Sequence, residues 1–322
     1  AVVTLMGLLA YPAMAKANYD KKFAAGVICA GGTLGILIPP SIMLIVYAAI
    51  AELSPLRLYA AAMFPGLLLA GLYIVYAITR ATLNPSIAPK PPAEDIPPTA
   101  EIYRDLLMSF LPLTVLIVTV LGSILGGLAT PAEAAAMGVV GVFLSAAIRR
   151  EVTWVLIRDS LKQTLETCGM IIWIGLGAAA LVGVYNLMGG NRFIESTILD
   201  SGASPIVIVL IMMGILIVLG LFMDWIGIAL LTMPIFVPII IKLGMDPVWF
   251  GILFAMNMQV SYLSPPFGPA AFYLKSVAPK DMHLSEIFRA LLPFIAIQVV
   301  ALAIVLFFPD VALWLPNWVK GG

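Results

Sequence analysis

The chain alternates long apolar segments with short polar ones, and most of the apolar segments are long enough to cross a membrane. About 20 consecutive apolar residues span a hydrocarbon core that is ~30 Å thick. A transmembrane β-barrel would instead need short segments of alternating polarity. The sequence therefore predicts an all-α polytopic membrane protein. The apolar segments cover about 1–15, 23–50, 56–82, 106–127, 129–148, 166–189, 205–241, 247–274 and 285–309.

Composition supports this class and excludes several others. Of the 322 residues, 62% are hydrophobic and 11% are charged, whereas a soluble domain carries about 25% charged residues. The net charge is zero, so there is no basic footprint for nucleic acid. His283 is the only histidine and there is no GxxxxGK[ST] loop, which argues against a Ser/His/Asp triad and against ATP hydrolysis through that motif. Cys29 and Cys168 lie in apolar segments, so we expect buried thiols and no disulfide.

Two polar segments divide the apolar pattern. The proline-rich stretch "NPSIAPKPPAEDIPP" (84–98) predicts an extended cytoplasmic linker, with outer limits at 83–105. In 149–167, charges alternate with apolar residues, which indicates an amphipathic helix lying at the membrane interface. The linker separates a first repeat (1–82) from a second repeat (106–322).

An internal repeat with an offset of 226 residues is the strongest pattern in the sequence. It relates Asp20 to Asp246, Pro12 to Pro238, and the Pro39-Pro40 pair to Pro265-Pro266. If 205–241 is a re-entrant hairpin, an odd number of crossings separates the two aspartates, and the repeats are inverted.

Each repeat carries a helix-breaking stretch inside an apolar segment: "GGTLGILIPPS" (31–41) and "NMQVSYLSPPFGP" (257–269). Proline removes a backbone donor and clashes with the preceding turn. At membrane depth, non-helical backbone is tolerated only where it lines a cavity or is buried in protein. Inverted repeats with broken helices are typical of secondary transporters. The alternative is a simple proline kink, with small residues that allow close helix packing.

Two carboxylates are candidates for function. Asp224 interrupts the apolar run 205–241, which predicts a hairpin tip near 223–226 that meets the break at 257–268. If the run is two crossings, Asp224 lies at a membrane edge instead. Glu133 follows Thr130 and Pro131, so it is either part of a helix N-terminal cap or a functional group.

Four stretches resemble the large membrane subunit of tripartite ATP-independent periplasmic (TRAP) transporters, in the branch named for mannitol and chloroaromatic compounds. These are "YDKKFAAGVICAGGTLGILIPPS", "ATPAEAAAMG", "GLFMDWIGI" and "SYLSPPFGPAAFYLKSVAP". The resemblance implies an elevator-type permease of the bacterial inner membrane, driven by Na⁺ as coupling ion. It also implies a periplasmic solute-binding protein that delivers an organic acid anion, and a small membrane subunit of four helices.

The resemblance further implies Na⁺ sites where hairpin tips meet broken helices. No catalytic residue and no organic cofactor are expected. Because the family's first hairpin tip precedes "AVVTLMG", the chain is expected to be an N-terminally truncated fragment. The residues that the resemblance assigns are Gly31, Thr33, Gly35 and Pro39 for one ion site; Asp224, Asn257, Gln259, Ser261 and Ser264 for the other; and Pro40, Ser41, Pro266 and Gly268 along the substrate path.

Other functions remain open from the sequence. An inverted-repeat dicarboxylate/Na⁺ symporter would work without a binding protein. An intramembrane enzyme would need a paired catalytic constellation, and Asp224 has no histidine or second carboxylate at helical spacing. A channel would need a continuous polar pore, whereas this sequence has two isolated polar breaks.

Overall fold

The computed structural model describes residues 2–90, 98–190, 193, 196, 202–279 and 282–320, and over this part of the chain it contains helices and no strands. Six of the described helices are long and apolar enough to cross a membrane, which confirms the all-α polytopic class. The α-helices are α1 (Val2–Lys16), α2 (Lys21–Thr33), α3 (Ile42–Ile50), α4 (Pro55–Leu83), α5 (Thr99–Leu125), α6 (Pro131–Ile148), α7 (Trp154–Leu187), α9 (Pro205–Gly220), α10 (Trp225–Lys242), α11 (Pro247–Leu263), α12 (Pro269–Lys275), α13 (Leu284–Phe307) and α14 (Asp310–Lys320).

The helices form two compact units. One unit combines Ala1–Lys90 with Gly177–Gly322, and the other is Pro91–Leu176. The first unit contains both breaks and the hairpin. Residues 91–97 of the expected linker lie outside the described residues, and α5 begins at Thr99, earlier than the apolar pattern indicates.

Both apolar segments with proline pairs are interrupted, as predicted. After α2 ends, a 3₁₀ turn (Leu34–Ile36) and the proline pair lead to α3, which Ser41 caps through the backbone N–H of Leu44. The second interruption separates α11 from α12, and both Pro-Pro bonds are cis. Each interruption is a full break rather than a kink, because several residues between α2 and α3, and between α11 and α12, are not helical.

Equivalent elements recur at the offset of 226 residues: α1 with α10, α2 with α11, α3 with α12, and α4 with α13. The helix starts match in detail. Asp20 caps α2 by accepting from Phe23 N at 2.8 Å, and Asp246 caps α11 by accepting from Val248 N at 2.7 Å. The same side-chain device therefore begins the broken helix of each repeat.

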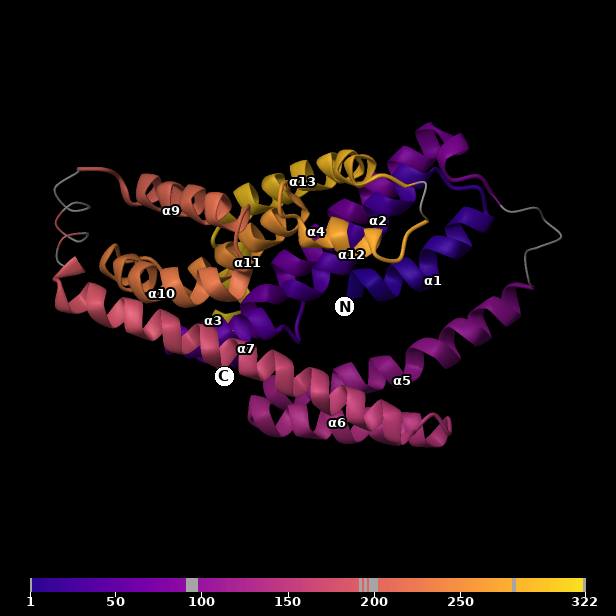
Figure 1. Cartoon of the computed structure of the whole chain (residues 1–322), viewed down its shortest axis with the longest axis horizontal. Helices are drawn as coiled ribbons and strands as arrows, with labels where there is room; N and C mark the ends of the chain where they lie inside the picture. The colour runs from indigo at the N-terminus through magenta and orange to yellow at the C-terminus, as the bar shows by residue number, and fades with distance from the viewer. Residues whose placement is uncertain are drawn as a thin grey trace. The chain divides into compact units, whose positions relative to one another are not determined.

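The packing of these elements is reciprocal between the repeats. The hairpin arm α10 packs against α3, and its counterpart α1 packs against α12 (Figure 1). Likewise α4 contacts α11, while α13 contacts α2. Such an exchange of partners is what a two-fold relation between repeats produces. Each broken helix is therefore packed against elements of the other repeat.

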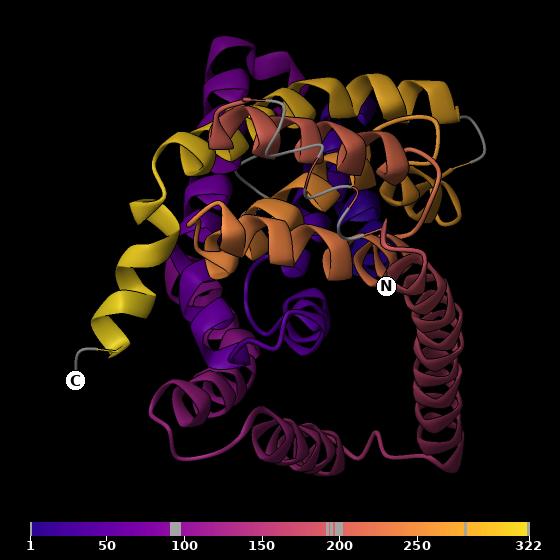
Figure 2. The same cartoon turned by 90° about the vertical axis from the view of Figure 1, so that its left-hand side faces the viewer.

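The run 205–241 folds as two helices with a turn between them. α9 ends at Gly220, α10 begins at Trp225, and the two helices lie side by side in both views (Figures 1 and 2). The turn therefore occupies 221–224, slightly before the predicted position, and Asp224 is its last residue.

α11 lies at the centre of its unit, and every residue from Val248 to Ser261 is buried. Polar contacts fix its first turns. The Tyr47 hydroxyl donates to the Pro247 carbonyl at 2.7 Å, and the Trp249 indole N–H donates to the Val305 carbonyl at 2.9 Å. At the same end, Arg57 and Asp246 form a half-buried ion pair at 3.5 Å. The contacts of Tyr47 and Arg57 join the two repeats at the start of α11.

In the second unit, α5 packs against α6, and Thr130 and Glu133 form a capping box at the start of α6. Thr130 N donates to a Glu133 carboxylate oxygen at 2.8 Å, and Glu133 N donates to the Thr130 hydroxyl at 3.3 Å. The capping interpretation of Glu133 is therefore confirmed, since its carboxylate completes a cap.

The expected interfacial helix at 149–167 is wrong, because α7 is one continuous helix of 34 residues that includes most of this segment and the following apolar one. Cys168, expected to be buried, is exposed on α7, while Cys29 is buried as predicted. An apolar sequence in a membrane protein does not distinguish a surface facing lipid from one facing protein.

The apolar pattern also missed α14. This last helix packs beside α4 (Figure 2). Trp314 and Phe64 form an edge-to-face contact, with 5.3 Å between their ring centroids. It has only 11 residues, too few to cross a membrane, so a search for long apolar runs does not find it.

The re-entrant hairpin predicts how two cysteines will label. In a background carrying Cys168→Ser, single cysteines at Ser204 and Lys242 should react with an impermeant maleimide from the same membrane face, because both ends of a hairpin lie together. Ser54 and Asn84, at the ends of the candidate span α4, provide the control and should label from opposite faces. Labelling of Ser204 and Lys242 from opposite faces would contradict the hairpin and the inverted topology.

Candidate functional site

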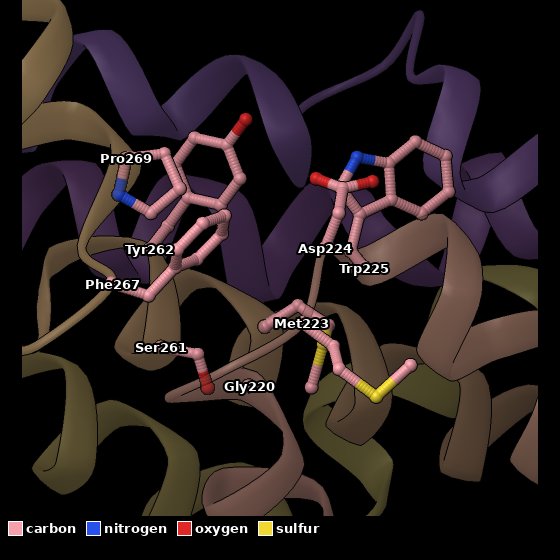
Figure 3. Close-up of a pocket in the computed structure, with 9 residues that line it drawn as sticks. Gly220, Met223, Asp224, Trp225, Ser261, Tyr262, Phe267 and Pro269 are labelled. Carbon is pink, nitrogen blue, oxygen red and sulfur yellow. The ribbon is translucent and has the colours of Figure 1, made fainter. Parts of the chain in front are cut away.

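The hairpin tip meets the end of α11 at a small cavity of about 10 Å³ (Figure 3). This volume is about that needed for one water molecule or an ion of similar size. The cavity lies where the sequence predicts the second ion site. Its lining residues come from α9, the tip, α10, α11, the second break and α12: Gly220, Met223, Asp224, Trp225, Met258, Ser261, Tyr262, Phe267 and Pro269.

Asn257 and Ser261 share the face of α11 that packs against α9. They are four residues apart, and the Ser261 hydroxyl donates to the Asn257 carbonyl at 3.3 Å. The Asn257 amide donates to the carbonyl of Met213 on α9 at 3.0 Å. Since that partner is a carbonyl, the amide nitrogen must face it, and the side-chain oxygen of Asn257 is buried without a hydrogen-bond partner.

Ser261 lies directly against the last residue of α9. A Cβ atom at Gly220 would overlap both the hydroxyl oxygen and the Cβ of Ser261, so glycine allows the hairpin to approach α11 this closely. Figure 3 shows the Ser261 hydroxyl directed toward Gly220. The structure therefore brings Ser261 and Asn257 to the hairpin, as expected for a shared site.

Gln259 does not join this group. Two residues along a helix correspond to a rotation of about 200°, so Gln259 faces away from Asn257 and Ser261. Its amide donates instead to the carbonyl of Thr33, at the end of α2, at 2.8 Å. Of the residues expected to form the second ion site, those within α11 are thus divided between two faces of that helix.

Asp224 caps α10. Its carboxylate accepts from the backbone N–H of Ile226 at 3.1 Å, and the side chain is half-buried. In Figure 3 the carboxylate lies beside Trp225 and away from Ser261. Of the two roles considered for Asp224, ligand or structural group, this geometry favours the structural one, because the negative charge is placed at the positive N-terminus of α10.

The remaining predicted residues of the second break lie in its turn. Ser264 ends α11, and its hydroxyl donates to the Val260 carbonyl at 2.7 Å, so this oxygen is directed back along the helix. Pro266 is exposed. Gly268 has φ +25°, and a Cβ there would overlap the ring of Phe288, so this turn requires glycine.

The first break has a different local arrangement. Gly31 and Gly35 lie four residues apart, and a Cβ at either would meet nothing within 4 Å. Thr33 is buried, and its hydroxyl donates to the Ala30 carbonyl at 2.8 Å. Pro39 is buried, Pro40 is exposed, and the Ser41 hydroxyl donates to the Ile36 carbonyl across the break. Ser41 therefore stabilises the break itself.

Helix ends of both polarities meet at the cavity. α9 ends at Gly220 and α11 ends at Leu263, so two C-termini bring partial negative charge, while α10 begins at Trp225 and α12 begins at Pro269, so two N-termini bring partial positive charge. The described residues contain no group of three or more His, Cys, Asp or Glu side chains that could hold a metal ion.

Several site residues were not identified from the sequence. Gly220 lies just before the hairpin tip. A glycine inside the apolar run 205–241 was the signal in the sequence that could have indicated this close contact. Met223, Trp225, Met258, Tyr262 and Phe267 enclose the cavity with side chains that are typical of any apolar segment.

Comparison with known proteins gives consistent matches over nearly the whole chain. Residues 1–311 match the family described as "Tripartite ATP-independent periplasmic transporter, DctM component". The C4-dicarboxylate TRAP transporter large permease protein DctM of Pseudomonas aeruginosa is 34% identical over 321 residues, covering 99% of this chain and 73% of the relative.

Two further relatives come from Vibrio cholerae. Its C4-dicarboxylate large permease DctM is 33% identical, over 100% of this chain and 74% of the relative. Its sialic acid TRAP transporter large permease SiaM is 28% identical, over 98% and 72%. These relatives are transporter permeases rather than enzymes. With its candidate spans and these matches, the chain belongs to the DctM family of TRAP transporters, as a large permease protein of the inner membrane.

Proposed function

We propose that this permease couples the uptake of an organic acid anion to Na⁺, and that a periplasmic solute-binding protein delivers the anion. The observation that carries the coupling is the meeting of the hairpin tip with the end of α11, where an ion-sized cavity, two helix C-termini and the Ser261 hydroxyl converge. The names of the relatives support an organic acid, since C4-dicarboxylates and sialic acid are carboxylates.

In this proposal the ion is a cargo that stabilises one packing of the hairpin. Na⁺ requires several oxygen ligands to replace its hydration shell. Ser261 and the carbonyls at the ends of α9 and α11 provide such oxygens, and the orphaned side-chain oxygen of Asn257 lies one turn earlier on the same face. Binding there would hold the hairpin against α11, so that the unit containing both breaks moves as one body in an elevator-type step.

The partners follow from the tripartite family. A small membrane subunit of four helices would cover exposed apolar surface of the permease, and the binding protein would dock on its periplasmic face. The second candidate function is a symporter that takes free dicarboxylate from solution. Because family membership implies a binding protein, the symporter is the less favoured candidate. It predicts uptake without a binding protein, which an uptake experiment can test.

Uptake should require both the binding protein and Na⁺. We expect proteoliposomes containing the permease and its small subunit to accumulate labelled anion only when the loaded binding protein and an inward Na⁺ gradient are both present. Replacing the Na⁺ gradient with an equal K⁺ gradient controls for ionic strength. Accumulation without the binding protein would support the symporter, and equal accumulation in K⁺ would refute Na⁺ coupling.

Ser261→Ala should weaken the ion site. Losing one neutral ligand should cost about 1 kcal/mol, which raises the Na⁺ concentration for half-maximal uptake roughly fivefold. Ser276→Ala is the matched control, because Ser276 is exposed at the end of α12 and its hydroxyl donates only to the nearby Tyr273 carbonyl. An unchanged Na⁺ dependence in a well-expressed Ser261→Ala permease would mean that the ion binds elsewhere.

Gly220→Ala should separate the hairpin from α11 and reduce uptake at least tenfold, because the new methyl group would overlap Ser261. Gly214→Ala makes the same chemical change on α9, where a Cβ meets nothing within 4 Å, and should leave uptake near that of the unmodified permease. The measurement is the initial uptake rate at saturating Na⁺ and equal protein content. Equal rates for the two variants would show that this contact is not needed for transport.

A further inference from the structure

The contact between Gln259 and Thr33 marks the symmetry axis of the permease. The two residues are 226 positions apart, which is the offset of the repeat, and they touch through the Gln259 amide and the Thr33 carbonyl at 2.8 Å. A residue that contacts its own counterpart in a two-fold arrangement must lie at the axis. The two broken helices α2 and α11 therefore meet there.

This contact also completes the end of α2. In an uninterrupted helix the Thr33 carbonyl would accept from Leu37 N, but that N–H donates to the Leu34 carbonyl instead. The Thr33 carbonyl instead begins the 3₁₀ turn Leu34–Ile36, and its oxygen, with two lone pairs, can accept from a second donor. Gln259, from the other repeat, supplies it.

Three more polar side chains gather around Thr33 to form what we call the axial cluster: Thr33, Tyr73, Gln259 and Gln298. All four residues are buried, with exposed fractions of 0%, 6%, 0% and 1% respectively. The Tyr73 hydroxyl lies near the side chains of Gln298 and Thr33. Yet the Tyr73 hydroxyl, the Gln259 side-chain oxygen and both amide atoms of Gln298 have no direct hydrogen-bond partner.

We propose that the axial cluster binds ordered internal water, which bridges Gln259, Gln298 and Tyr73 at the junction of the two broken helices. Polar groups that are close but do not meet hydrogen-bond geometry are the usual setting for a bridging water. A buried polar group left unsatisfied is costly, and a water molecule with three partners removes that cost.

The chemistry of the cluster selects water over a cation. The orphaned atoms include acceptors, the Gln259 and Gln298 oxygens, and a donor, the Gln298 amide nitrogen. Water can donate to the first and accept from the second, whereas a cation binds oxygens alone.

The role of Gln259 then changes from a direct ion ligand to a link between the repeats. Its amide nitrogen is fixed on the Thr33 carbonyl, so the side chain faces away from the face of α11 shared by Asn257 and Ser261. The cluster is separate from the proposed ion site, and its hydration does not depend on the proposed function.

The test combines a thermal double-mutant cycle with a map of the permease bound to its small subunit. Tyr73→Phe and Gln298→Met each remove a water ligand and should each lower the Tm by about 2–4 °C. The double variant should lower the Tm by less than the sum, because both changes act on the same bound water. Gln163→Met, on the exposed part of α7, is the matched control and should leave the Tm unchanged.

A high-resolution map should show a density feature within hydrogen-bond distance of the Gln259 oxygen in the unmodified protein, and none in the double variant. If Gln298→Met fails to fold, Tyr73→Phe, which removes a single oxygen, still provides the map comparison. Strictly additive Tm shifts with no density would overturn the proposal. Density that appears only with added Na⁺ would also overturn it, because the occupant would then be a cation.

Discussion

The cost of an unsatisfied backbone group in a bilayer governs the arrangement of this permease. Hydrocarbon offers no hydrogen-bonding partner, so interrupted helices persist only where they are buried in protein or line a cavity. Elements of the opposite repeat flank each interruption, with α10 against α3 and α1 against α12, while the turn at 265–267 is exposed. The reciprocal packing therefore supplies part of the surroundings that the breaks require.

Side chains complete what the breaks leave open. Ser41 bridges the first break by donating to the Ile36 carbonyl and accepting from Leu44 N, and Gln259 takes the carbonyl of Thr33. At the hairpin, Asp224 caps α10 and Asn257 joins α11 to α9. These polar side chains hold the backbone in place. Only side chains with an atom that has no hydrogen-bond partner, such as the side-chain oxygen of Asn257, remain available to a ligand.

The sequence could predict the elements of this fold because its strongest signals are local. Proline pairs break helices wherever they occur, Asp224 in an apolar run requires a turn or an edge, and the offset of 226 relates both breaks. The sequence did not predict that the polar residues of α11 lie on two different faces. The residues at 257–264 show which polar side chains are present, but not the direction in which each one points. The burial of Cys168 was wrong for a related reason, because apolar sequence does not say whether lipid or protein lies beside it.

The two breaks differ although they descend from equivalent positions, and the difference separates their tasks. α2 ends at Thr33, whereas α11 continues past the counterpart Gln259 to Leu263. On α11, Asn257 and Ser261 occupy the places of Gly31 and Gly35, so side-chain oxygens meet the hairpin in one repeat while bare backbone is presented in the other. Under the proposed Na⁺ coupling, a cation at the second break would meet side-chain oxygens that face the hairpin, whereas the side-chain oxygens of the first break are the hydroxyls of Thr33 and Ser41, which donate to backbone carbonyls. The first break therefore depends on how its backbone is held, by Ser41 across the break and by Gln259 from the other repeat.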